Sequence, residues 1–184
     1  KRNFRRGAAK VVFPQTATHS HVYLDFPEGQ FAAQQSNEVA YFNEGFSEQA
    51  ATVVAILSSS VMNFYMVHSG SRVQSGYLRF LANVLRPFPV PDLSEEICFQ
   101  LSSLTRTLLS TAHTAMSYSM HSLVREEEYR SAEELLGKRE ETIANYRAAL
   151  EEMKRLQDEL DHLVYRLYGI TDPEDIAELE QSLY

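Results

Sequence analysis

The first ninety residues alternate short apolar runs with turn-forming residues, a pattern typical of a small sheet. Runs of aromatic and β-branched residues separated by Pro, Gly and Asn predict four strands, at residues 11–13, 21–26, 31–33 and 39–42. An apolar stripe at helical spacing begins after Ser47 and ends at Gly70, which predicts one long buried helix. A further short strand is expected at residues 77–80. The first part of the chain is therefore predicted to be a small mixed sheet with a buried helix.

Beyond residue 91 apolar residues recur every three or four positions, which predicts an all-helical second part. Three prolines at alternate positions in residues 86–91 predict an extended connector before it, because proline fixes φ and lacks an N–H. Ser94 and Thr171 are expected to cap the first and last helices, and Gly169 to end the long one between them. That helix carries a strict heptad stripe with one polar position, which predicts packing along another helix: Ile143, Tyr146, Leu150, Met153, Gln157, Leu160, Val164 and Leu167.

These patterns predict the α+β class: a small mixed sheet with a buried helix, followed by an all-helical C-terminal hairpin with heptad packing. The distribution of charged residues along the chain also indicates a boundary between two units at the connector. Residues 1–91 hold eight Lys/Arg against five Asp/Glu, a net of +3, whereas residues 92–184 hold nine against twenty, a net of −11. We therefore predict two units, residues 1–91 and residues 92–184, with the basic excess in the first.

With 184 residues, 44% of them hydrophobic, the chain can bury a core and is too apolar to be wholly disordered. Its single cysteine, Cys98, excludes an internal disulfide and a cysteine-rich zinc module, and favours a reducing compartment, for which we expect the cytoplasm. Serine and asparagine interrupt the longest apolar run, residues 50–67, so no membrane-spanning helix is expected. The chain opens at Lys1 without an apolar signal-peptide core, and we expect it to be a fragment of something longer.

The motifs of a catalytic centre are missing from the sequence. It has no glycine-rich phosphate loop and no Asn-Pro pair, so neither a nucleotide site nor the Asn-Pro-Pro-aromatic motif of amino methyltransferases is present. His19 and His21 have no cysteine or paired acid around them, and no metal site is predicted. We expect no catalytic residue and no cofactor within these residues.

Basic residues are more informative. Five of them in the first ten positions surround Phe4 and have the composition of a phosphate-contacting arm: Lys1, Arg2, Arg5, Arg6 and Lys10. A frayed terminus with adventitious charge is the alternative. Around a glycine-bearing loop stand Arg72, Gln74, Tyr77 and Arg79, where Arg can bind guanine or phosphate and Gln can read adenine. For that loop the alternative is an ordinary polar turn.

Seven passages in a fixed order resemble a known family: residues 10–14 (KVVFP), 40–42 (AYF), 55–65 (AILSSSVMNFY), 69–70 (SG), 75–80 (SGYLRF), 87–91 (PFPVP) and 161–172 (DHLVYRLYGITD). Together they resemble the TaqI-like C-terminal specificity region of adenine-N6 DNA methyltransferases, which include fused type II restriction-modification enzymes and related phage-defence methylases. The long acidic stretch at residues 125–159 departs from that pattern. The order of proline run and long helices also resembles type I specificity subunits, in which helices set the distance between recognition domains.

The resemblance implies that this chain selects the DNA sequence to be methylated. A catalytic domain preceding it would bind S-adenosylmethionine and flip out the target adenine, so the chain itself is expected to be non-catalytic. Residues 69–79 match the passage of the family that gives the expected DNA contacts, Arg72, Gln74, Ser75, Tyr77 and Arg79. Arg72 and Arg79 would meet phosphate or guanine, Gln74 a base edge, and Tyr77 a sugar or a stacked base. Alternatively, residues 77–80 serve packing, and the base-reading side chains lie in residues 19–35.

The expected partners are double-stranded DNA and the methyltransferase domain of the same protein. A homodimer through residues 143–167 is a further expectation, because the heptad stripe could pair with a second copy. The alternative function is therefore a coiled-coil interaction module. Whether the parent enzyme also cleaves DNA, and which bases it reads, stay open.

Overall fold

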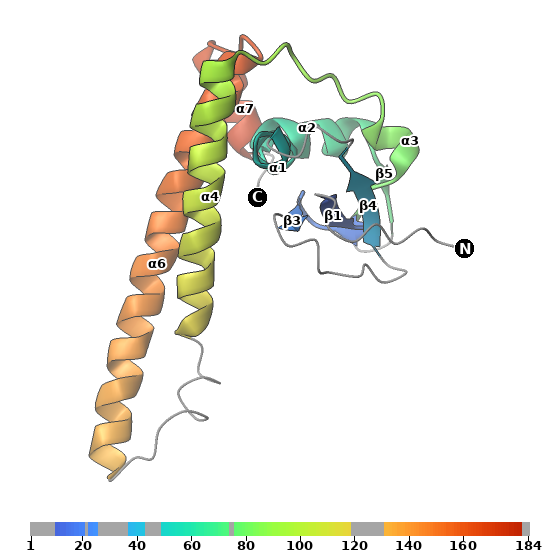
Figure 1. Ribbon diagram of the computed structural model, residues 1–184. Coiled ribbons are helices and arrows are strands. Elements are labelled where there is room, and N and C mark those ends of the chain that lie inside the picture. The colour runs from blue at the N-terminus through green and yellow to red at the C-terminus, as the bar shows by residue number, and fades with distance from the viewer. Residues whose placement is uncertain are drawn as a thin grey trace. The chain divides into compact units, whose positions relative to one another are not determined.

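A computed structural model of the chain describes residues 10–20, 22–25, 37–42, 49–73, 76–118 and 131–181. It confirms the α+β class, with small antiparallel sheets and a helical C-terminal region (Figure 1). The strand expected at residues 31–33 and the helix start at Ser47 lie outside the described residues.

The described strands form two three-stranded sheets. In the first, β1 (Lys10–Pro14) lies between β3 (Tyr23–Asp25) and β4 (Asn37–Tyr41). In the second, β6 (Leu78–Arg79) lies between β2 (Thr16–Ala17) and β5 (Ser71–Arg72). Every described strand pair is antiparallel, so the part of the sheet that the structure describes is antiparallel rather than mixed.

The predicted long helix is two helices, α1 (Ala50–Leu57) and α2 (Ser60–Ser69), bent by 57° at the break. Ser59 stands there in an extended conformation, and its side chain accepts a hydrogen bond from the Met62 N–H. Serine side chains compete for backbone hydrogen bonds and favour caps over helix interiors, which explains why the helix breaks at the serine triplet. No described helix is by itself long and apolar enough to cross a membrane, although α1 and α2 together pass that test of length and composition.

After α3 (Ala82–Leu85), residues 86–94 form no regular element, as the proline pattern predicts. Helix α4 (Glu95–Ser117) begins at the predicted cap, where the Ile97 N–H donates to Ser94 Oγ. Helix α6 (Ala132–Leu167) ends at Gly169, whose φ of 71° suits glycine. Helix α7 (Pro173–Gln181) is capped by Asp172 instead of the predicted Thr171.

The described chain forms two compact units, residues 1–105 with 160–184, and residues 106–159. This division differs from the predicted one at residue 91 because the start of α4 and residues 160–184 also pack into the first unit, where Leu101, Leu160 and Leu179 belong to the core. The proline connector packs there too. Phe88 is buried there, and the Tyr168 hydroxyl donates to the Pro89 carbonyl. The first unit holds nine Lys/Arg against fourteen Asp/Glu, a net of −5, so the basic excess of residues 1–91 is offset by acidic residues from the rest of the chain.

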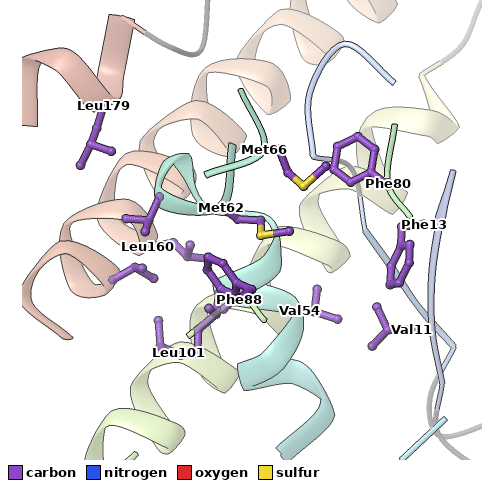
Figure 2. Packing of buried hydrophobic residues seen from close by; sticks show 14 of the residues in the cluster. Val11, Phe13, Val54, Met62, Met66, Phe80, Phe88, Leu101, Leu160 and Leu179 are labelled. Atoms are coloured by element: carbon purple, nitrogen blue, oxygen red, sulfur yellow. The ribbon is translucent and has the colours of Figure 1, made fainter. Parts of the chain in front are cut away.

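The core of the first unit draws buried residues from both sheets and from α1, α2, α4, α6 and α7. Figure 2 shows them converging from these elements; the labelled ones include Val11, Phe13, Val54, Met62, Phe80, Leu101, Leu160 and Leu179. Such an assembly from distant segments of the chain gives the unit a single core.

The heptad stripe is divided between the two units. Leu160 and Val164 are buried in the core of the first unit, as expected of heptad positions. In the second unit Tyr146 and Leu150 are exposed, and Leu156, which is not in the predicted stripe, is buried instead. The periodicity identified the apolar face of α6 correctly, but α4 does not cover that face over residues 143–153.

Candidate nucleic-acid interface

The β5–β6 hairpin carries the loop for which DNA contact is predicted, and its base is fixed to the core. Leu78 and Phe80 are buried, with only 2% of each exposed. Strand β6 pairs on both sides, with β2 and with β5, and the Phe80 N–H donates to the Gln15 carbonyl at 2.9 Å. Because the base is held by packing and by backbone hydrogen bonds, the exposed residues next to it have a defined position.

The turn of the hairpin depends on glycine. The Val73 N–H donates to the Tyr77 carbonyl, and the Gly76 N–H donates back to Val73. Gly76 has a φ of 82°, a left-handed conformation that costs other residues about 1–2 kcal/mol. Where the chain enters the hairpin, a Cβ on Gly70 would lie 2.5 Å from the Met66 carbonyl oxygen. The glycines of the SG and SGYLRF passages are thus explained by the backbone.

Three of the predicted DNA-contacting residues lie together on this hairpin. Arg72 and Arg79 are exposed, and 44% of Tyr77 is exposed. The register places Arg79 opposite Thr16 and Ser71, and Arg72 opposite Leu78. Since side chains alternate between the faces of a strand, the two arginines leave the hairpin on opposite faces.

Of the other predicted DNA-contacting residues, the structure describes only Lys10. Gln74 and Ser75, in the turn, and four residues of the basic arm lie outside the described residues: Lys1, Arg2, Arg5 and Arg6. Lys10 is described, and it is 1% exposed within β1. Lys10 therefore does not belong to an exposed phosphate-contacting arm, because β1 is the central strand of its sheet and neighbouring residues cover the side chain. Most of residues 19–35, the alternative reading surface, also lies outside the described residues.

The sequence reasoning did not identify Thr16 and Ser71, although both are exposed polar residues beside Arg79. The position of Thr16 depends on the pairing of β6 with β2, about sixty residues apart in the chain, and that of Ser71 on the register of the β5–β6 hairpin; periodicity reveals neither. Arg86 was also overlooked. It lies at an apolar cavity of about 240 Å³ lined by Phe13, Ser20, Val22, Ala40, Leu57, Met62, Phe80 and Leu85.

Two other passages of the resemblance meet at a buried cluster of polar groups. The Ser60 N–H donates to Asp161 Oδ1 at 2.8 Å, and Ser60 Oγ lies 2.7 Å from the Tyr165 hydroxyl. All three residues are at least 96% buried. The Asp161 carboxylate sits at the N-terminus of α2, where the free N–H groups and the helix dipole favour negative charge. We call these three residues the α2–α6 cluster.

Two tyrosine hydroxyls make a second set of hydrogen bonds, around the proline connector, which we call the tyrosine ties. The Tyr65 hydroxyl donates to the Val84 carbonyl at 2.9 Å, and its ring stacks edge-on against Phe88 at 5.0 Å. The Tyr168 hydroxyl donates to the Pro89 carbonyl at 2.7 Å, and burial raises the pKa of Tyr168 to about 12. The aromatic residues of the NFY and LVYRLY passages therefore hold the connector against the helices.

No protein-family model matches this chain, and neither does any curated protein.

Proposed function

We propose that this chain is the DNA target-recognition region of an adenine-N6 DNA methyltransferase of the restriction-modification or phage-defence type. The observation that carries the proposal is the hairpin, which presents Arg72, Tyr77 and Arg79 to solvent from a fixed base. The resemblance of the SG and SGYLRF passages to methyltransferase specificity regions falls on these residues.

Arginines on opposite faces suggest how the hairpin would meet DNA. The major groove is about 12 Å wide and admits a two-stranded β-ribbon. Because β6 also pairs with β2 and Leu78 is buried, the hairpin would reach the groove with its turn and its β5 edge, where the exposed Arg72 and Arg79 guanidinium groups can bind phosphate or guanine. Tyr77 would then lie near the sugars or bases, with Thr16 and Ser71 next to Arg79 as polar neighbours.

In this account the α2–α6 cluster and the tyrosine ties support recognition without touching DNA. The polar atoms of the cluster are buried and hydrogen-bonded to each other. The Tyr65 and Tyr168 hydroxyls are already used in hydrogen bonds to the backbone carbonyls of Val84 and Pro89. S-adenosylmethionine, the methyl donor of the family, would bind the catalytic domain, and the residues of this chain would supply only the choice of sequence. Double-stranded DNA and that domain are the proposed partners, in the cytoplasm.

Titration of a pool of random-sequence DNA duplexes tests the proposal, at salt concentrations from about 50 to about 200 mM. We expect Arg72→Ala/Arg79→Ala to weaken binding about 10- to 100-fold and to reduce the slope of log affinity against log salt by about 1–2. The matched control is Arg106→Ala/Arg166→Ala, which removes the same charge from exposed positions that are not part of the hairpin. Equal losses in the two double variants, or no salt-dependent binding at all, would refute the proposal.

A further inference from the structure

Helix α6 exposes a stripe of large apolar side chains within the second unit. Leu136, Tyr146 and Leu150 are 55%, 42% and 41% exposed, and Ile143 and Met153 next to them are only partly buried. These residues occupy the a and d positions of the heptad repeat, which in a coiled coil face a partner helix. We call the four of them within residues 143–153 the α6 stripe: Ile143, Tyr146, Leu150 and Met153.

Helix α4 is not this partner helix, because it packs on the face of α6 next to the a and d positions. The g positions of the repeat are Thr142, Ala149 and Leu156, and Thr142 and Leu156 are buried. Ala149 lines a polar groove between the two helices together with Thr111 and Thr114 of α4. The a and d positions thus lie beside the contact between α4 and α6, on a surface that no described residue covers.

We propose that the α6 stripe binds a second copy of this chain in antiparallel orientation. The stripe is self-complementary when reversed: Ile143 of one copy meets Met153 of the other, and Tyr146 meets Leu150. Each layer then pairs an a with a d position, as antiparallel coiled coils do. A two-fold axis near the middle of the stripe makes both halves of the interface equivalent.

The charges beside the stripe favour this orientation over the parallel one. A parallel pair brings e positions against g positions of the partner, and the g residues here are uncharged, so the charged e residues would gain no ion pair. An antiparallel pair brings e against e on one side of the stripe and g against g on the other. The e residues are Glu140, Arg147 and Lys154, so Glu140 of each copy meets Lys154 of the other. The described ion pairs of α6 use other residues: Lys138–Glu141, Arg155–Glu152 and Arg155–Glu159.

Arg147 lies at the centre of this arrangement, where the two copies of its side chain approach each other. Like charges facing one another weaken a helix pair. Replacing Arg147 by alanine should therefore tighten an antiparallel dimer. If the stripe instead bound an unrelated acidic protein, the same change would remove an attractive charge and weaken binding.

Sedimentation equilibrium of the 184-residue chain tests the proposal. The stripe spans about 15 Å of helix, so we expect a weak dimer, with the mass rising from 21.0 kDa toward twice that value between about 5 and about 500 μM. Leu150→Glu should abolish the rise. Ala144→Glu, which places the same charge at an exposed position on another face of α6, should leave it unchanged. Leu160→Asp would be a poor test, because Leu160 belongs to the core of the first unit.

Exchanging the charges at the e positions tests whether the two copies pair in antiparallel orientation. Lys154→Glu should raise the dimer dissociation constant several-fold, and Glu140→Lys/Lys154→Glu should restore it. Arg147→Ala should lower it about 1.5- to 2-fold. A chain that stays monomeric at every concentration overturns the proposal, and so does a dimer that survives Leu150→Glu. Failure of the double exchange to restore the dimer overturns the antiparallel arrangement. None of these outcomes depends on DNA binding, so the two proposals fail separately.

Discussion

The α2–α6 cluster and the β5–β6 hairpin lie in the same compact unit, and both contain residues of the passages that resemble methyltransferase specificity regions. In the cluster, Ser60, Asp161 and Tyr165 are buried and satisfy each other's hydrogen bonds. In the hairpin, only Leu78 of β6 points inward, and Arg72 and Arg79 are exposed. Residues of the resembling passages therefore divide into a buried, hydrogen-bonded set and an exposed set, and only the exposed set is accessible to a ligand.

The largest expected effect comes from breaking the cluster. Asp161→Ala leaves the Ser60 N–H without its acceptor in a buried site, and we expect it to lower the free energy of unfolding by about 2–3 kcal/mol. Chemical denaturation followed by circular dichroism measures this. Glu151→Ala removes a carboxylate from an exposed position of the same helix and should change stability by less than about 0.5 kcal/mol. Equal effects of the two changes would mean that the buried hydrogen bond is not important.

A smaller loss is expected for Tyr165→Phe, which removes only the hydroxyl that meets Ser60 Oγ. The ring and its packing stay, so the free energy of unfolding should fall by about 1 kcal/mol. Tyr146→Phe is the control, since that hydroxyl belongs to an exposed tyrosine. If Tyr165→Phe were as stable as the wild type, the cluster would owe its stability to Asp161 alone.

The smallest effect concerns the tie between Tyr168 and the proline connector. Burial raises the pKa of Tyr168 from 10.0 to about 12, so the folded state favours the neutral phenol. The stabilisation that follows is complete below pH 10 and is lost as the pH rises to about 12. Stability measured over this range should fall more steeply for the wild type than for Tyr168→Phe, which has no hydroxyl to ionise. Parallel curves would contradict the role given to this hydroxyl.

Local signals in the sequence predicted much of the fold. The strand at Lys10–Pro14, the cap at Ser94 and the helix end at Gly169 depend on neighbouring residues, and all three are confirmed. The break between α1 and α2 was not predicted, because apolar periodicity continues through the serine triplet. The pairing of Ser60 with Asp161 joins residues 101 positions apart, and no local pattern reveals it.

The candidate site shows the same limit. The glycine-bearing turn and its arginines were visible in the sequence, but the face that each arginine takes depends on the register of β6 with β2 and β5. Lys10 belongs to a basic run in the sequence and is buried in the structure. The heptad stripe predicted an apolar face on α6 without indicating which element covers it.

The central claim is that stability and DNA binding reside in different residues of this one unit. The most direct measurement is the affinity for duplex DNA of Arg79→Ala and of Tyr165→Phe, under conditions in which circular dichroism shows both to be folded. We predict that Arg79→Ala loses about 10-fold or more in affinity with unchanged stability, and that Tyr165→Phe binds like the wild type. Wild-type affinity in Arg79→Ala, or an equal loss of affinity in both variants, would contradict the account.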